Sequence, residues 1–517
     1  MTSNKAKKTR KEIVSRETLL KVFQLLVFSS ILNFCIVFRR GLELEVVVGT
    51  FLIINLLLLI LYRDFIRYKP SIYKDHKMLL LIGILLSINF IIGRGIYDIL
   101  EGFTMWLGHR DTEWIIYALP LATGSMLVAL LIDIHTAIVF SVISSLLSGI
   151  LLNNPFYTIF TFASSLTAAF GVIRCKRRSA IWRAGLFVGL VSLFTALTIR
   201  YLQGQFITTG TPLTAGVAFF NGLLVATLVS AFLPLFEYLF SLTTDISLLE
   251  HLDLNQPVMK NLLLEAPGTY HHSIMVGSLV EAAAEAVEVD PLLARVSAYY
   301  HDIGKIKMPE YFVENQRLPV SRHEKLAPRM SSLILMSHVK EGVELARKHK
   351  LPQSVIDIIQ QHHGTSVMTY FYEKAKVQRG DEANPPSENE FRYPGPKPQT
   401  RVAALVLMAD AVEAASRAEL SDPTPARISE LVDRIINRFF LDGQLDSCEL
   451  TLKDLREIKS NFVFILASMF RKRIHYPGFE IKDDDTDKQS TEPHPFKKGK
   501  DKKSSPEDSF PLKTFQS

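Results

Sequence analysis

The sequence predicts an all-α protein, a polytopic transmembrane helical bundle followed by an all-helical soluble domain. Two observations support this class. The chain has 517 residues, of which 48% are hydrophobic, and its long apolar runs are concentrated before residue 241. Runs of about 20 mostly apolar residues are typical of membrane spans. After residue 240, apolar residues recur with helical periodicity, and no convincing β alternation is present.

Eight apolar runs are long enough to span a bilayer. An even number places both ends of the chain on one side of the membrane. Lys and Arg mark the cytoplasmic side, and they cluster at the N-terminus, near 63–77 and near 174–178. We therefore expect the basic tail 1–17 and everything after residue 240 in the cytoplasm, with Arg39 and Arg40 as a local exception. The expected spans are 18–38, 43–62, 77–97, 114–133, 135–153, 155–173, 183–201 and 214–240, and the fifth and sixth could be divided differently.

Charge and cysteine content exclude several other classes. The net charge is +6, but the excess lies in short basic clusters beside apolar runs, so we attribute it to membrane topology rather than to nucleic-acid binding. The three cysteines, Cys35, Cys175 and Cys448, lack metal-type spacing and indicate no disulfide framework. The first apolar run is long and has no small-residue cleavage site, so we expect a retained anchor.

The second half of the chain divides into three parts. Residues 241–262 are predicted to form a helical connector, and 263–476 an all-helical domain. The tail 477–517 is rich in Lys, Asp, Ser and Pro and is expected to be disordered. Within the domain, Thr269 is a plausible N-cap for the next helix, and Pro291 fits the first turn of another.

A spaced series of histidine and aspartate residues forms the candidate site. Imidazole nitrogen and carboxylate oxygen suit Mn, Fe or Zn. One carboxylate, Asp302, can bridge two ions, and the histidines would then divide between them. Two close ions form a clamp for in-line attack on phosphorus. His251, His271, His323 and His349 are expected to have no such role. The series is His272, His301, Asp302, His338, His362, His363 and Asp410.

Three motifs give the sequence a family resemblance. They are LLLEAPGTYHHSIMVG at 262–277, YYHDIGK at 299–305 and FRYPGPKP at 391–398. The sequence resembles the multi-pass HD-domain phosphodiesterases of PgpH type over roughly residues 115–476. Those bacterial enzymes cleave cyclic di-AMP, so the resemblance implies an HD phosphohydrolase domain at 263–476, facing the cytoplasm from the inner membrane.

The resemblance also implies roles for individual residues. Asp302 and Lys305 would be catalytic, with Lys305 also binding non-bridging phosphate oxygens of the substrate. Two divalent ions, most readily Mn or Fe, would be the cofactors. Independently of the resemblance, the segment 379–400 is predicted to be a surface loop, and the two aromatic residues of its motif at 391–398 could close over a substrate. The implied ligands are His272, His301, Asp302 and Asp410 for one ion, and Asp302, His338, His362 and His363 for the other.

Two differences from related proteins bear on function. Better-known members carry a large extracellular domain after the first span, whereas only 39–43 lie there in this chain. HD enzymes that cleave cyclic di-GMP carry a Gly-Tyr-Pro motif after the histidine pair, and 363–370 lack it. By this resemblance, the missing motif favours cyclic di-AMP over cyclic di-GMP as the substrate. The expected product is therefore linear pApA. The expected partners are cyclic di-AMP and the lipid bilayer, with a homodimer left open and no nucleic acid polymer.

Two other functions remain open from the sequence. One is hydrolysis of a different nucleotide by the same metal set. The other is a membrane receptor whose HD domain binds a nucleotide without cleaving it, although such a protein would be expected to lose ligands, and all seven are present.

Overall fold

The computed structural model describes residues 2–470 except 39–42, 109–111, 174, 176, 317–320, 380–385 and 421–422. The predicted all-α class is confirmed, because the described residues form helices and no β-sheet, with one isolated bridge between Val367 and Arg392. The tail predicted at 477–517 and the arginine pair at 39–40 lie outside the described residues.

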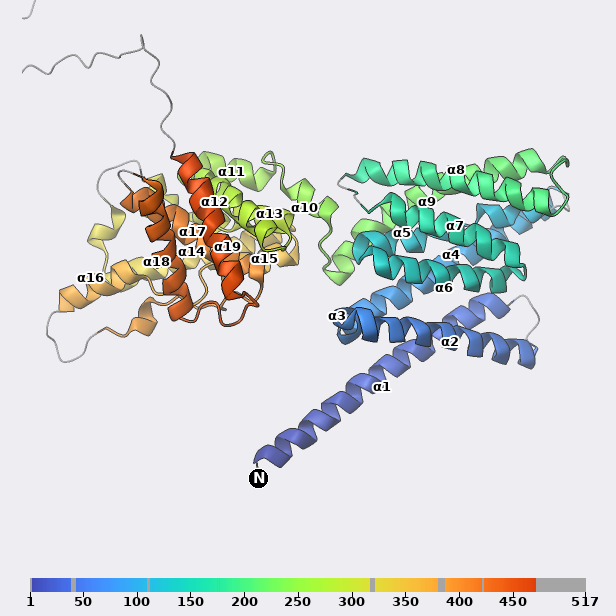
Figure 1. Cartoon of the computed structure of the whole chain (residues 1–517), viewed down its shortest axis with the longest axis horizontal. Coiled ribbons are helices and arrows are strands. Elements are labelled where there is room, and N and C mark those ends of the chain that lie inside the picture. Colours follow the sequence, from blue (N-terminus) through green and yellow to red (C-terminus); the bar gives the residue numbers. More distant parts are fainter. Residues whose placement is uncertain are drawn as a thin grey trace, which may run out of the picture. The chain divides into compact units, whose positions relative to one another are not determined.

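The first half of the chain forms a bundle of long apolar helices (Figure 1). A helix satisfies its backbone hydrogen bonds internally, as the hydrocarbon of a bilayer requires. The first helix runs back through the predicted basic tail to Thr2. The elements are α1 (Thr2–Val37), α2 (Leu44–Tyr68), α3 (Pro70–Lys74), α4 (His76–Trp106), the 3-10 helix η1 (Glu113–Ala118), α5 (Ala122–Leu131), α6 (Ile134–Leu152), α7 (Pro155–Gly171), α8 (Arg178–Leu202) and α9 (Thr211–Phe240).

The number of spans depends on α7. Within the described part of the chain, seven segments are helices long and apolar enough to cross a membrane, and α7 is not among them. It has 17 residues, the short end of the usual range for a span. It packs against both α6 and α8 in the bundle (Figure 1). The predicted count of eight therefore stays a prediction that rests on this helix.

The span predicted at 114–133 is interrupted. Its first part is η1, and α5 begins only after Pro120, which cannot donate a backbone hydrogen bond. Two buried asparagines satisfy the freed carbonyls. Asn221 of α9 donates to two of them, at 2.9 and 3.1 Å, and Asn89 of α4 donates to the carbonyl of Leu121 at 2.9 Å. Irregular backbone at membrane depth is tolerated when it is satisfied by protein in this way.

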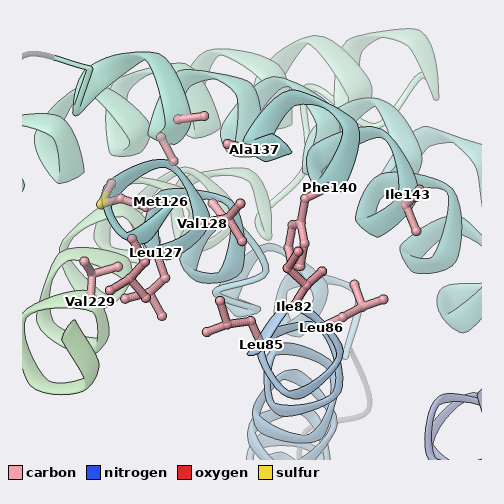
Figure 2. Packing of buried hydrophobic residues seen from close by; sticks show 14 of the residues in the cluster. Ile82, Leu85, Leu86, Met126, Leu127, Val128, Ala137, Phe140, Ile143 and Val229 are labelled. Atoms are coloured by element: carbon pink, nitrogen blue, oxygen red, sulfur yellow. The ribbon is translucent and has the colours of Figure 1, made fainter. Parts of the chain in front are cut away.

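Close packing of apolar side chains holds the bundle together. Figure 2 shows Ile82 and Leu85 of α4 near Met126 and Leu127 of α5, with Phe140 of α6 beside them. All five are at most 3% exposed. In a bilayer, where lipid is as apolar as these side chains, such contacts act through van der Waals packing.

The second half of the chain forms the helical domain (Figure 1). Among its described residues, five of the shorter elements are 3-10 helices. The elements are α10 (Asp245–His251), α11 (Pro257–Glu265), α12 (Pro267–Ala286), α13 (Pro291–Tyr300), η2 (Ile303–Lys307), η3 (Pro309–Tyr311), η4 (Val313–Asn315), η5 (Arg322–Lys325), α14 (Pro328–Lys348), α15 (Gln353–Gln361), α16 (Thr369–Arg379), η6 (Glu388–Phe391), α17 (Arg401–Glu419), α18 (Pro425–Leu441) and α19 (Leu452–Met469).

The domain is organised around α17, whose residues 402–409 are all buried against α12 and neighbouring helices. A second apolar cluster lies under α13 and α15. Leu248 and Leu262, from the predicted connector 241–262, belong to this second cluster. The connector therefore forms two helices that share the core of the domain, because their apolar faces need burial.

Candidate metal centre

Helix α12 carries His272 into the interior of the domain. The helix begins at Pro267, whose fixed φ suits a first turn. The prediction that Thr269 is its N-cap is wrong. Thr269 lies inside the first turn, fully buried, and its hydroxyl donates to the carboxylate of Glu314. His271 is exposed, as expected for the neighbour of a buried helical residue, since successive residues diverge by about 100°.

The His301-Asp302 pair lies where α13 gives way to η2. As predicted, Pro291 occupies the first turn of this helix. His301 keeps a helical conformation, and Asp302 has left the helix, with φ −108°. A Cβ on Gly304 would lie 1.9 Å from the carbonyl oxygen of His338. Glycine at this position therefore lets η2 lie directly against α14, which brings His338 to the aspartate.

His362 and His363 lie at the end of α15. Gly364, with φ +53°, adopts the left-handed conformation that commonly ends a helix. The two imidazole rings are 4.0 Å apart between centroids. The ring of Tyr393 stacks on that of His363 at 4.2 Å and 29°. Asp410 enters the site from the long buried helix α17.

All seven predicted ligands come together as two groups of four that share Asp302. Within each group, one ligand atom per residue can be chosen so that all lie within 4.8 Å of one another. The division is the one that the family resemblance implies. The first group is His272, His301, Asp302 and Asp410, and the second is Asp302, His338, His362 and His363.

Asp302 directs one carboxylate oxygen toward each group. Oδ2 lies 3.1 Å from Nε2 of His301 and 3.7 Å from Nε2 of His272. Oδ1 lies 3.3 Å from Nε2 of His338 and 3.6 Å from Nε2 of His362. The side chain is 1% exposed. A carboxylate in this position is suited to bridge two ions.

Hydrogen bonds at Nδ1 orient the histidine rings. Nδ1 of His301, His338 and His362 each donates to the backbone carbonyl three residues earlier. Nδ1 of His272 is bonded to a carboxylate oxygen of Glu413. Because carbonyl oxygens and ionised carboxylates only accept, each of these rings carries a proton on Nδ1, and its Nε2 faces the centre as the atom that a metal would bind. This arrangement is the usual support for a metal-ligating histidine.

The residues present fit a divalent transition metal. Nε2 of His301 and both oxygens of Asp302 are buried and make no hydrogen bond of acceptable geometry with any residue that the structure describes. Buried polar atoms that make no hydrogen bond are destabilising, and metal coordination would satisfy all three, of which only Oδ2 of Asp302 has an ammonium, that of Lys305, within 2.7 Å. The donors are nitrogen and oxygen without thiolate, which suits Mn, Fe or Zn.

Comparisons with known proteins give the family. The model "7TM receptor with intracellular HD hydrolase" matches residues 44–244, and the model "HD domain" matches 269–415. The chain is 36% identical over 439 residues to the cyclic-di-AMP phosphodiesterase PgpH of Bacillus subtilis, covering 83% of this chain and 60% of the relative. It is 38% identical over 378 residues to PgpH of Listeria monocytogenes, covering 72% and 52%.

The chain belongs to the PgpH-type family of multi-pass membrane HD-domain proteins. It spans between half and two thirds of the length of these two PgpH relatives. The crystal structure of the L. monocytogenes PgpH HD domain is 43% identical, covers 42% of this chain and all of that domain, and has a TM-score of 0.40.

In the PgpH-type site, burial and the neighbouring carboxylates change the pKa values of the histidine rings. Burial disfavours a charged His272 ring, but hydrogen bonds with Asp410 and Glu413 outweigh burial and raise its pKa to about 9. Burial acts in the same direction on His301, and the neighbouring Asp302 carboxylate raises the pKa of that ring to about 10. His338 behaves differently, because burial dominates and lowers its pKa to about 4.

Two residues of the PgpH-type site, Glu413 and Glu314, were not assigned from the sequence. Glu413 follows Asp410 by three positions on α17, so helical spacing could have suggested it. Glu314 contacts the site through Lys305 and carries no local signal. Tyr393 belongs to a motif expected to close over substrate, but the second aromatic of that motif, Phe391, is 2% exposed and packs in a small apolar core. That part of the expectation is wrong.

Proposed function

We propose that this chain is a membrane-anchored, metal-dependent phosphodiesterase that hydrolyses cyclic di-AMP to linear pApA. The observation that carries the proposal is the single buried carboxylate, Asp302, shared by two groups of metal-type ligands. Ions that share a carboxylate lie close together, as in-line displacement at phosphorus requires. Two relatives named cyclic-di-AMP phosphodiesterase support the dinucleotide, rather than a nucleic acid polymer, as the substrate.

Two divalent ions, Mn or Fe, are the proposed cofactors. When bound, they acidify a water molecule and neutralise charge on the phosphodiester. The protein's part is to hold the nitrogen and oxygen donors in place and to shield them from bulk solvent. His301 and His362 are fully buried and Asp302 nearly so. His363 is the most exposed of the seven candidate ligands, with 21% of its side chain accessible, and marks the side from which a substrate would approach.

Lys305 and Tyr393 are proposed to meet the substrate. The ammonium of Lys305 lies 2.7 Å from Oδ2 of Asp302, close enough to stabilise non-bridging phosphate oxygens beside the metal centre. Tyr393 is held by a backbone hydrogen bond of 3.0 Å to the carbonyl of Ser366 and stacks on His363. An aromatic ring fixed at the mouth of the site is suited to contact a nucleobase or its ribose.

The catalytic domain is proposed to face the cytoplasm of a bacterial cell. The family model for the membrane region covers 44–244, a stretch that holds seven of the eight expected spans. Together with α1 this supports an even number of crossings, which places the basic N-terminus and the HD domain on the same side. Positive charge at the cytoplasmic face is the physical reason for that orientation.

Turnover by the full chain tests the substrate. Purified protein in detergent, loaded with Mn, is incubated separately with cyclic di-AMP and cyclic di-GMP, and kcat/KM is compared. We expect faster cleavage of cyclic di-AMP with pApA as product, because a site built for one set of exocyclic groups leaves groups unpaired with the other. Equal or faster cleavage of cyclic di-GMP would overturn the substrate. Metal binding without turnover of any nucleotide would favour the receptor instead.

A further inference from the structure

Lys305 is held between two carboxylates on opposite sides. Its Nζ lies 2.7 Å from Oδ2 of Asp302 and donates to Oε1 of Glu314 at 2.8 Å. The ring of Phe312 covers the ammonium at 5.0 Å, and only 13% of the lysine side chain is exposed. Among the described residues, these two carboxylates are the only ones in ion-pair contact with it.

The second carboxylate, Glu314, is itself fixed from α12. Its Oε1 accepts a hydrogen bond of 2.9 Å from the hydroxyl of Thr269, which is fully buried. Asn315 adds two hydrogen bonds to this network. Its amide donates to the same hydroxyl at 2.8 Å, and its side-chain oxygen accepts from the backbone N–H of Thr269 at 3.2 Å. Glu314 therefore cannot swing away from the lysine without breaking a buried network.

The backbone at Gly268 allows close contact between α12 and the segment that carries Glu314. A Cβ on Gly268 would lie 1.9 Å from the carbonyl oxygen of Glu314 and 3.0 Å from the side chain of Asn315. Only glycine allows the first turn of α12 to lie directly on η4. His272 lies four residues later on the same helix and faces the metal centre. The first turn of α12 therefore fixes the positions of both the His272 ligand and Glu314, the partner of Lys305.

Charge explains why such a partner is needed. Two divalent ions bound at the site would repel a lysine ammonium only a few ångströms away, since Coulomb energies at such distances are large in a buried site. The carboxylate of Asp302 would then be shared with the ions and would offset little of that repulsion. Glu314 belongs to neither ligand group, so its negative charge stays available to Lys305.

We infer that Glu314 is a positioning residue that holds the Lys305 ammonium against the metal centre, where it receives a phosphate group of the substrate. The inference deepens the proposed phosphodiester hydrolysis and rests on it. Glu314 acts through the lysine and not on the substrate itself. Thr269 and Asn315 keep the glutamate in place.

A double-mutant cycle in the full chain tests this assignment. The variants are Glu314→Gln, Lys305→Gln and the pair, each loaded with Mn in detergent. The readouts are Mn content and the dissociation constant for inorganic phosphate, measured by calorimetry, with kcat and KM on cyclic di-AMP alongside. We expect Glu314→Gln to weaken phosphate binding about tenfold or more, as for loss of a charged hydrogen bond, with Mn content unchanged. In the Lys305→Gln background the same change should have no further effect.

Controls keep the outcomes separate. Glu310→Gln removes another carboxylate nearby, one that pairs with Arg322 on the exposed surface, and should leave phosphate affinity unchanged. If Glu314→Gln does not fold, Thr269→Val takes its place in the cycle and should give a smaller loss in the same direction. An additive effect in the Lys305→Gln background, a loss of Mn, or unchanged phosphate affinity would overturn the positioning role. Absence of turnover in the wild type would refute the proposed function alone, because phosphate binding is measured independently.

Discussion

Nδ1 of His272 is hydrogen-bonded to Oε2 of Glu413, and the two residues are 141 positions apart in the sequence. This contact turns Nε2 of the ring toward Asp410, 3.0 Å away. The other oxygen of Glu413 is bonded to Arg417, one turn further along α17. The glutamate is 2% exposed, so its orientation is fixed on both sides.

Removing the charge of Glu413 should weaken metal binding without removing a ligand. We expect Glu413→Gln to lower the affinity for Mn by about 10- to 100-fold, the usual effect of losing a carboxylate that supports a ligating histidine. Competition with a chelator on the full chain measures this. Glu419→Gln, on the same helix but paired with Arg434 at the surface, is the matched control and should bind Mn normally. Wild-type affinity in Glu413→Gln would contradict the supporting role.

Asp302→Ala should abolish hydrolysis and reduce the Mn content, because the shared carboxylate is lost from both ligand groups. Metal analysis and turnover on cyclic di-AMP check this, with Asp302→Asn as a second variant that preserves the side-chain shape. His271→Ala should retain most of its activity, since that ring is exposed and outside both groups. Near-normal turnover by a folded Asp302→Ala variant would refute a shared role for this aspartate.

Metal binding should release protons and strengthen as pH rises. In the absence of metal, His272 and His301, with pKa values raised to about 9 and about 10, are charged at pH 7. A metal ion requires neutral rings, so loading at pH 7 should release about two protons, and affinity should fall about 100-fold per unit of falling pH. Calorimetry in buffers of different ionisation enthalpy gives the proton count. Affinity that does not change between pH 6 and pH 8 would contradict the charged rings.

The ends of the chain should lie on the same side of the membrane. Reporters that distinguish cytoplasm from exterior, fused before Met1 and after Ser517, should both report the cytoplasm, and one inserted in the loop 203–210 should report the exterior. The basis is the alternation of Lys and Arg clusters together with α7 as a crossing helix. A cytoplasmic loop at 203–210, with the two ends on opposite sides, would show that α7 does not cross.

Much of this protein could be predicted without the structure. Apolar length and helical period located the membrane helices and the helical domain, because both signals are local to each segment. The seven candidate ligands were also predictable, since the residue types that bind divalent metals are few and their series is distinctive. The interruption of the span at 114–133 was not predicted, because the asparagines that satisfy it come from α4 and α9.

The sequence by itself therefore determined the helical class, the apolar segments that TM-length criteria of about 20 residues select, and the identity of the candidate ligands. Only the tertiary structure decided how those ligands divide around the two oxygens of Asp302, that Thr269 binds Glu314 instead of capping a helix, and that Glu413 supports His272. The last two are contacts between side chains 45 and 141 positions apart. Such contacts depend on how helices pack, and local periodicity and spacing carry no information about that packing.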